Sequence, residues 1–432
     1  MPHPTLNLKQ KIQSGHQSNN QPSVSIIDRG CGTGKTTEII ESFKPGEKYL
    51  VVVPFLDECD RIIEKTRELY GEGFFVQPEV SSYHGTKGNH LRHLLKTNKN
   101  IVTTHELYLS IVMASREGSL QDRHLIIDEV LSVVEAKEGP TSDIWKTFFV
   151  DKQYVEVCRE TGRIKPTDVW EADVEAVKFD WFYRKAQSGC LYVLDGSFFV
   201  WSLPADVLHQ AKSTKIYTFL SDGSFMKHWL LKEGVRFTQE PVSIREQHLK
   251  DFKAKTRSLL TIDSISRKIE NLNYSCSGQR TMRPEQHRRI NEALKNLSRR
   301  QLGGVPKEDI LITSLQSQWF KKPPSSPGAT DGTAGVFSKQ TGLFKDTNWC
   351  SNVTRGTNKY KHCTHAIYLY DQHPHPAISR FLGIDNQESK EDYAICELIQ
   401  WLYRTCIRDG LPCTLYMPSK RMRAVLEDWL EI

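Results

Sequence analysis

A glycine-rich loop near the start of the chain is the feature that most constrains its fold. Residues 25–37 read Ser-Ile-Ile-Asp-Arg-Gly-Cys-Gly-Thr-Gly-Lys-Thr-Thr, so an apolar run gives way to glycines and then to a lysine and threonines. A buried strand, a loop without bulky side chains and a helix start together form a cradle for phosphate, because backbone N–H groups can turn inward towards an anion. The order of these parts predicts a phosphate-binding loop, or P-loop, between a buried strand and a helix.

The loop supplies candidate residues for phosphate and for one magnesium ion. The candidate phosphate-binding residues are Gly30, Gly32, Thr33, Gly34, Lys35, Thr36 and Thr37. Lys35 is expected to reach the outer phosphates and Thr36 to hold Mg2+. Arg29 stands where the pattern G-x-x-x-x-G-K-[ST] has its first glycine, which favours the helicase-type form x-x-x-G-x-G-K-T. The alternative is an ordinary glycine-rich turn, which leaves the Lys-Thr pair unexplained.

Length and composition allow two or three domains and argue against a membrane or disulfide-stabilised protein. The chain has 432 residues and a net charge of +6, which is compatible with a polyanionic partner. Its ten cysteines include no C-x-x-C pair, a usage typical of reduced thiols in a cytoplasmic protein. No apolar run approaches the ~20 residues of a membrane span, and the polar start has no signal-peptide core. We therefore expect no membrane partner and a cytoplasmic location, or the host cytoplasm if the protein is viral.

Two series of apolar runs, several of them separated by helical patterns, predict two α/β domains. The first series covers residues 49–54, 100–104, 124–128, 190–194 and 216–220, with a helix over 56–70. A charged helical stretch over 240–300 precedes the second series, which covers 309–313, 335–337, 365–370 and 412–417 with a surface loop over 321–333. This alternation favours mostly parallel sheets covered on both faces. We expect a flexible tail over 1–22, a first domain over 23–238, and linker helices with a second domain over 239–432.

Two acids end one of the apolar runs, Leu125-Ile126-Ile127-Asp128-Glu129. The carboxyl end of a strand in an open α/β sheet is where ligands bind. Asp128 is expected to contact the magnesium shell, and Glu129 to orient and deprotonate an attacking water. An apolar strand that ends in two acids is also common by chance, but the position of this one after a P-loop favours the functional interpretation.

Further candidates lie at strand ends and on a helix in the second half. Thr103 and Thr104 end a strand and could hold nucleic-acid phosphates, or serve as ordinary helix caps. Asp-Gly-Ser at 222–224 follows Ser221 and precedes a helix, which suits a coupling loop. Arg404 and Arg408 are four residues apart on a helix predicted from near residue 392, so both project from one face. Paired cations suit a γ-phosphate in its transition state, whereas the alternative is a solvated basic face.

The order of these segments resembles the motifs of superfamily 2 helicases, in the compact DEAD/DEAH-box-like form of phages and mobile elements. The segments are the P-loop, Val-Val-Pro at 52–54, Thr-Thr-His at 103–105, Asp-Glu at 128–129, Ser-Asp-Gly-Ser at 221–224, Arg-Gly-Thr-Asn at 355–358 and Gln-x-x-x-Arg-x-x-x-Arg at 400–408. The resemblance covers roughly residues 24–425 and implies two RecA-like domains that form a P-loop NTPase helicase core. It also implies ATP and Mg2+ as cofactors.

The resemblance also implies roles for residues outside the P-loop and the acidic pair. Ser221 and Ser224 would couple hydrolysis to movement, Arg355, Gly356 and Asn358 would lie at the domain interface, and Gln400, Arg404 and Arg408 would complete the ATP site. The chain departs from the family pattern in its Asp-Glu-Val-Leu box, in its coupling motif and in a last motif that is one residue longer. The choice of arginine finger therefore stays open, with Arg408 favoured and Arg404 expected to contact the γ-phosphate or the other domain.

The sequence thus predicts an ATP-dependent nucleic-acid helicase or translocase with weak sequence preference. DNA is favoured over RNA because of the phage-like form, and replication or recombination proteins are expected as further partners. Three alternatives stay open: an RNA helicase, a nucleic-acid-stimulated ATPase clamp or remodeller without unwinding activity, and a one-domain P-loop kinase with an unrelated appendage. The last of these leaves the second α/β series and the paired arginines unexplained.

Overall fold

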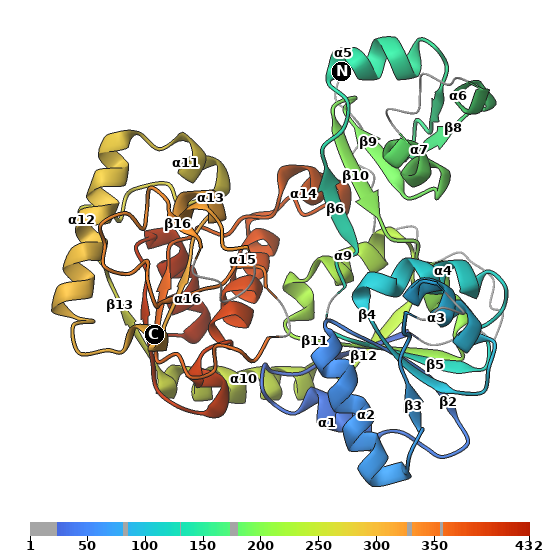
Figure 1. Cartoon of the computed structure of the whole chain (residues 1–432), viewed down its shortest axis with the longest axis horizontal. Helices are drawn as coiled ribbons and strands as arrows, with labels where there is room; N and C mark the ends of the chain where they lie inside the picture. The colour runs from blue at the N-terminus through green and yellow to red at the C-terminus, as the bar shows by residue number, and fades with distance from the viewer. Residues whose placement is uncertain (1–23, 81–84, 130, 173–179, 326–330, 355–356) are drawn as a thin grey trace.

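The computed structural model describes residues 24–80, 85–129, 131–172, 180–325, 331–354 and 357–432. These residues form two α/β domains that lie side by side, the first in blue to green and the second in yellow to red (Figure 1). Each domain is built on a parallel sheet with helices on both faces. The predicted fold class, α/β with two domains built on mostly parallel sheets, is confirmed.

The sheet of the first domain contains the strand that leads into the glycine-rich loop. In spatial order its strands are β12 (Phe237–Gln239), β1 (Val24–Asp28), β11 (Ser213–Thr218), β5 (Arg123–Asp128), β2 (Lys48–Val53), β4 (Asn100–Thr104) and β3 (Phe75–Val76), all parallel. Parallel strands end at the same edge of a sheet, so the segments after β1, β5 and β2 lie in a row along that edge.

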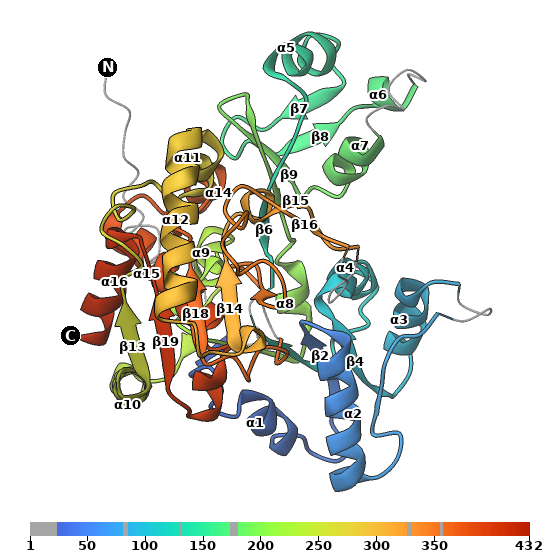
Figure 2. The same cartoon turned by 60° about the vertical axis from the view of Figure 1, so that its left-hand side comes forward.

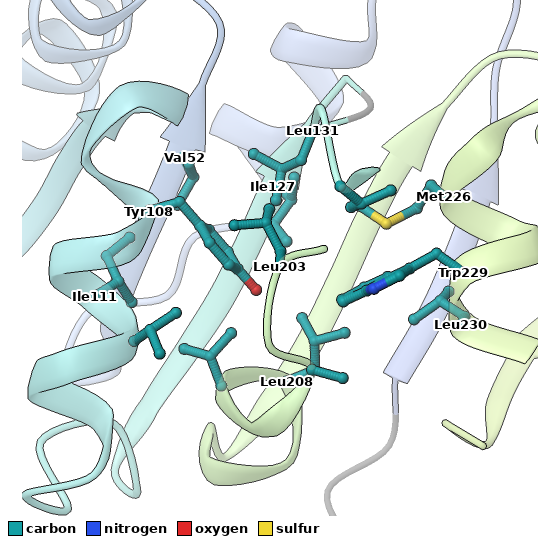
Figure 3. Close-up of a cluster of buried hydrophobic side chains, with 14 of the residues drawn as sticks. Val52, Tyr108, Ile111, Ile127, Leu131, Leu203, Leu208, Met226, Trp229 and Leu230 are labelled. Carbon is teal, nitrogen blue, oxygen red and sulfur yellow. The ribbon is translucent and has the colours of Figure 1, made fainter. Parts of the chain in front are cut away.

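Alternating side chains along these strands explain why helices cover both faces. On β2, Leu50 and Val52 belong to one buried cluster and Val51 and Val53 to another, as expected for a strand buried on both sides. The cluster with Val51 and Val53 contains apolar residues of α1 (Lys35–Glu41) and α2 (Leu56–Tyr70). The cluster with Val52, shown in Figure 3, contains residues of α3 (Lys87–Leu95), α4 (Tyr108–Ser115), α8 (Asp206–Gln210) and α9 (Phe225–Lys232).

An insertion between β5 and β11 rises above the first domain at the upper right of Figure 1. Its elements are β6 (Val134–Lys137), α5 (Ser142–Ile144), a π-helical segment (Trp145–Val150), β7 (Val155–Val157), β8 (Ile164–Pro166), α6 (Asp168–Ala172), α7 (Asp180–Gln187), β9 (Leu191–Leu194) and β10 (Phe198–Ser202). It has its own aromatic core around Phe149, Trp170 and Phe182. The prediction that residues 190–194 belong to the parallel sheet is wrong, because β9 pairs antiparallel with β10. A short apolar run indicates a buried strand but not its partner.

The second domain has a smaller parallel sheet with helices on both faces. In spatial order its strands are β13 (Leu260–Asp263), β19 (Cys413–Tyr416), β18 (His365–Tyr368), β14 (Ile310–Thr313) and β17 (Asn348–Trp349). One face is covered by α10 (Val242–Leu259), α15 (Gln387–Leu402) and α16 (Lys420–Leu430). The other face is covered by α12 (Pro284–Arg300), next to α11 (Cys276–Thr281), as Figure 2 shows.

Two expectations for the second domain are wrong. The charged stretch over 240–300 is not helical throughout, because β13 lies within it at the edge of the sheet. Residues 335–337 form no strand. The strand there is β16 (Thr333–Ala334), which pairs antiparallel with β15 (Phe320–Lys322), so the two ends of the predicted surface loop form a hairpin after α13 (Gln316–Trp319). Glycine and proline in this segment indicate a turn but not the pairing at its ends.

The two domains share buried surface at α14 (Pro376–Leu382) and at the short 3-10 helix Ser221–Gly223. Helix α14 packs against β6, β10 and α9 of the first domain, and Figure 1 shows it beside β10. The centroids of the Phe381 and Tyr192 rings are 4.8 Å apart. The 3-10 helix packs against α15, where a Cβ added at Gly223 would lie 2.2 Å from the carbonyl oxygen of Asp392. The domains are therefore in close contact at both places.

Two features bear on the composition-based expectations. Within the described ranges, no helix is both long and apolar enough to cross a membrane. All ten cysteines are free thiols, and Cys59, Cys190, Cys350, Cys363, Cys396, Cys406 and Cys413 are buried.

Candidate active site

The glycine-rich loop faces the second domain. After β1 the chain turns through Gly32 and Gly34, whose φ angles of +75° and +91° lie in the left-handed region that glycine adopts without strain. A Cβ added at Gly30 would lie 2.4 Å from the ring of Phe252, and one added at Gly32 would lie 3.0 Å from Cγ of Arg408. Because Phe252 and Arg408 belong to the second domain, these two glycines also permit the close approach of the domains.

The residues after the glycines begin α1 and reach a cavity between the domains. Lys35 and Thr36 line this cavity together with Gly32 and Gly34. Thr33 is exposed, and its hydroxyl donates to the carbonyl of Gly30 at 2.9 Å, which stiffens the loop. Thr37 is exposed on α1, outside the described wall of the cavity. The structure therefore brings part of the predicted phosphate-binding set together around one space.

Arg29, at the irregular position of the loop, connects three segments. Its guanidinium pairs with Glu38 of α1 at 2.9 Å and with Glu240, just after β12, at 2.5 Å. The hydrogen bond to Glu240 is the main cause that raises the pKa of Arg29 above its ordinary value, and the bond to Glu38 adds to it. An arginine here thus fixes the loop to α1 and to the segment that enters the second domain, which a glycine could not do.

The carboxylate of Asp128, at the end of β5, lies against the P-loop. Its Oδ2 accepts a hydrogen bond from Thr36 Oγ1 at 3.1 Å, while Oδ1 is buried without a hydrogen-bond partner among the described residues. Burial raises the pKa of Asp128 to about 6, and a nearby cation would favour its charged form. A hydroxyl and a carboxylate are oxygen ligands of the kind that Mg2+ prefers, with water and substrate phosphate completing its shell. The pair therefore fits a magnesium ion.

Glu129 has an unusual backbone conformation for a side chain of its size. Its φ of +62° lies in the left-handed region, which costs a non-glycine residue of order 1–3 kcal/mol and is common at functional sites. His105 holds the preceding residue, because its Nε2 donates to the carbonyl of Asp128 at 3.1 Å. Burial lowers the pKa of His105 to about 4, so the imidazole is neutral near pH 7. The strained backbone aims Glu129 into the cavity, which it lines beside Asp128.

The second domain contributes Gln400, Arg404 and Arg408 to the same cavity. The prediction that both arginines lie on one helix is wrong: α15 ends at Leu402, Arg404 lies in the following turn and Arg408 in the 3-10 helix Cys406–Asp409. Gln400 is buried near the end of α15, and its amide donates to the sulfur of Cys396 at 3.0 Å. The arginines thus converge on the cavity through the fold of the chain after α15 and not through helical spacing.

Arg404 is the more constrained of the two arginines. It is buried, and its Nη2 lies 3.9 Å from Oε2 of Glu129 across the domain boundary. Its guanidinium also donates to the carbonyls of Thr354 and Thr357 at 3.5 Å each. Arg408 is partly exposed and packs on Gly32. Arg404 is therefore placed beside the acids and Arg408 beside the phosphate loop.

The wall of the cavity is made of residues from both domains. The full described lining is Cys31, Gly32, Gly34, Lys35, Thr36, Pro54, Glu58, Arg61, Asp128, Glu129, Gln400, Tyr403, Arg404, Arg408 and Asp409. Sequence reasoning missed Glu58, Arg61, Tyr403 and Asp409. Glu58 and Arg61 stand three residues apart after the Val-Val-Pro segment, and this spacing on α2 was the available signal.

The candidate coupling residues have different surroundings. The Ser221 N–H donates to both carboxylate oxygens of Asp28 at 3.2 and 3.1 Å, which connects the end of β1 to the short helix against α15. Ser224 is buried and its hydroxyl donates to the Ser221 carbonyl at 2.7 Å. Thr103 and Thr104 are also buried, at the end of β4. Asn358 is exposed, and the predicted interface residues Arg355 and Gly356 lie outside the described residues.

Comparison with known sequences finds a family model and a full-length relative. Residues 242–430 match the model described as the YonV C-terminal Rossmann-like domain, a range that runs from the first residue of α10 to the last of α16. The chain is also similar to the SPbeta prophage-derived uncharacterized protein YonV of Bacillus subtilis (strain 168). The two are 26% identical over 94% of this chain and 98% of that protein.

Three solved structures are similar to the chain at low TM-scores. Xpd4 of S. tokodaii has a TM-score of 0.40 and 12% identity, with 94% of each chain covered. The DUF1998 helicase MrfA bound to DNA and AMPPNP has a TM-score of 0.36 and 8% identity, with 95% of this chain and 48% of MrfA covered. S. cerevisiae Dbp5 bound to RNA and ADP BeF3 has a TM-score of 0.37 and 10% identity, with 96% of this chain and 84% of Dbp5 covered. Likenesses this distant carry no functional conclusion to this chain.

Proposed function

We propose that this chain is an ATP-dependent nucleic-acid helicase or translocase that hydrolyses ATP between its two domains. The observation that carries the proposal is a single cavity lined by the P-loop lysine, by an acidic pair and by two arginines of the opposite domain. Each group has a place in phosphoryl transfer, where catalysis consists mainly of positioning and of stabilising charge. We propose residues 23–238 and 239–432 as the two units that move against each other.

The residues of the cavity divide the chemistry between them. Lys35 and the loop amides bind the phosphates, and Thr36 and Asp128 would hold Mg2+, which would neutralise part of the phosphate charge. Glu129 orients a water and accepts its proton as the water oxygen bonds to the γ-phosphorus. The bond to the bridging oxygen breaks with its electron pair left on ADP. Arg408, or Arg404, stabilises the charge that develops during this transfer.

Contacts of Ser221 and Arg29 connect the P-loop to the second domain, and we propose that they transmit changes in the loop. Asp28 directly precedes the loop and accepts from the Ser221 N–H, and the short helix that begins at Ser221 packs on α15. Arg29 pairs with Glu240 at the entry to α10. We propose that these contacts transmit hydrolysis to domain movement, with Ser224, Arg355, Gly356 and Asn358 as further interface residues. At the end of β4, backbone groups beside Thr103 and Thr104 would contact nucleic acid, since the hydroxyl side chains are buried.

We favour DNA over RNA as the polymer, with action in the cytoplasm beside replication or recombination proteins. The net charge of +6 is compatible with either polymer, and the prophage-derived relative supports a phage-associated role. A motor of this kind holds the sugar–phosphate backbone, so binding should depend steeply on salt and weakly on base sequence.

The test is ATP hydrolysis measured in parallel without polymer and with single-stranded DNA, duplex DNA and RNA. Lys35→Ala serves as the inactive control. Stimulation by DNA together with strand separation supports a helicase, whereas stimulation without separation favours the ATPase clamp or remodeller. Preferential stimulation by RNA would identify RNA, and not DNA, as the polymer on which the chain acts. Hydrolysis that is equal in wild type and in Lys35→Ala would overturn the proposal.

A further inference from the structure

Two residues of α2 line the nucleotide cavity without a role in the chemistry proposed above. Glu58 and Arg61 lie one turn apart near the start of the helix and form an ion pair, with Arg61 Nη1 3.3 Å from Glu58 Oε2. The Glu58 side chain is 11% exposed, whereas that of Arg61 is 42% exposed and reaches both the cavity and solvent. A buried carboxylate thus holds a partly solvated cation at the rim of the cavity.

The order of the strands shows where this pair lies relative to the P-loop. The carboxyl ends of β1, β11, β5 and β2 follow one another along one edge of the sheet. The P-loop follows β1, the acidic pair follows β5, and α2 follows β2. Neighbouring strands are ~4.8 Å apart, so α2 begins one strand beyond the acids, on the side away from the P-loop.

In the proposed reaction, that side of the cavity would receive the attacking water and release the phosphate. In an in-line displacement, the attacking and leaving oxygens lie on opposite sides of the phosphorus. The leaving oxygen lies on the side of the P-loop, because the P-loop binds the phosphates that remain on ADP. The attacking water and the freed inorganic phosphate therefore belong at the end lined by Glu129 and α2.

A phosphate dianion at this end needs a cation of its own. Lys35 and Arg408 belong to the P-loop end, where Arg408 packs on Gly32. Arg404 lies beside Glu129, but its guanidinium already donates to the carbonyls of Thr354 and Thr357. Among the described residues that line the cavity, Arg61 is the basic side chain contributed by α2. Its guanidinium can bind phosphate through two parallel N–H donors.

We propose that Arg61 binds the inorganic phosphate product as it leaves the cavity. Glu58 is then the positioning residue, because its carboxylate forms the ion pair with Arg61 again after the phosphate has left. This inference rests on the proposed ATP hydrolysis and adds a product-release site to it. Because Glu58 and phosphate compete for the same guanidinium, removal of the carboxylate should strengthen phosphate binding, whereas removal of the cation should weaken it. A merely structural ion pair would give neither effect.

The experiment measures the affinity of inorganic phosphate for the ADP- and Mg2+-bound full chain by calorimetry, and phosphate release by a fluorescent sensor in single turnover. The variants are Arg61→Gln and Glu58→Gln. Arg67→Gln is the matched control, because Arg67 is exposed on the same helix and does not line the described cavity wall. Folding is verified by thermal melting, and ADP affinity is measured for each protein.

Arg61→Gln is expected to weaken phosphate binding by about fivefold or more, since a charge-assisted contact is lost. Glu58→Gln should tighten phosphate binding and slow phosphate release, and Arg67→Gln should match wild type, all with unchanged ADP affinity. Phosphate affinity in Arg61→Gln within about twofold of wild type would overturn the inference while leaving ATP hydrolysis intact. Weaker phosphate binding in Glu58→Gln would overturn the role of Glu58. A wild-type chain without ATP hydrolysis would instead refute the proposed function itself.

Discussion

The contact between the P-loop and α10 predicts that Gly30→Ala opens the interface between the domains. Gly30 is not among the residues with positive φ, so its backbone admits alanine. The new Cβ would however lie 2.4 and 2.9 Å from two ring carbons of Phe252, and 2.8 Å from the methyl group of Thr33. Carbon atoms in contact stay ~3.5–4.0 Å apart, so the overlap with the ring is about 1 Å. Thr33 is exposed and can rotate, but Phe252 is buried and cannot.

Overpacking of this kind costs about 1–3 kcal/mol. Phe252 belongs to the second domain, so the chain relieves the overlap by moving that domain away from the P-loop. If closure of the domains is needed for hydrolysis, the same free energy lowers kcat by about 5- to 150-fold. Nucleotide affinity should change little, because Lys35 and the loop amides stay in place. Steady-state ATPase and equilibrium nucleotide binding measure the two effects separately.

Rescue separates this mechanism from damage to the loop. Phe252→Leu makes room for the added methyl group, so the double variant should recover turnover, with a favourable coupling of about 1–3 kcal/mol in a double-mutant cycle. Gly34→Ala is the control: no atom lies within 4 Å of its added Cβ, and its φ of +91° makes the substitution strained in any case. Phe252→Leu should not rescue it. Wild-type turnover in Gly30→Ala, or equal rescue of both glycine variants, would refute the reasoning.

Other predictions concern the cavity and the contact at α14. Lys35→Ala should abolish phosphate release, whereas Glu129→Gln should bind ATP as wild type does and stall turnover; nucleotide binding and single-turnover assays distinguish them. Arg408→Ala should lower kcat by ~10³-fold with little change in ATP affinity, and Arg404→Ala should also lower it. A change within about twofold for both arginines would favour a binding module. Phe381→Ala should lower the free energy of unfolding by about 3–5 kcal/mol in urea titrations, because the ring is buried; a change under about 1 kcal/mol would contradict that packing.

The parts of the fold that sequence predicted well are those set by local pattern. The predicted helix over 56–70 and the strand over 100–104 have the same bounds in the structure. In both, the arrangement of apolar residues fixes which side is buried, and a proline or a polar segment marks the boundary. The P-loop and the acidic pair also come together as predicted, since parallel strands bring their carboxyl ends to one edge.

The end of α15 shows what local pattern could not give. No glycine or proline occurs between residues 387 and 409, so the sequence favours a helix through both arginines. The structure ends the helix at Leu402, where distant residues bind the chain that follows. The Tyr403 hydroxyl bonds to Thr256 at 2.7 Å and its ring stacks on Phe252 at 4.8 Å. These contacts come from α10, about 150 residues earlier, and no local signal in the sequence encodes them.

The position of α14 could not be predicted from the sequence either. Its packing bears on how the domains could separate. Ala377, Ile378, Phe381, Leu382 and Ile384 are buried in a core whose other members belong to the first domain. Separation of the domains at this point would expose these side chains, at about 1.5–3 kcal/mol for each one larger than alanine. Separation at the nucleotide cavity exposes mainly glycines, arginines and carboxylates, which water solvates well, together with the Phe252 ring that packs on Gly30. We therefore predict that separating the domains costs less at the cavity than at α14, and that the cavity opens with α14 as the fixed side.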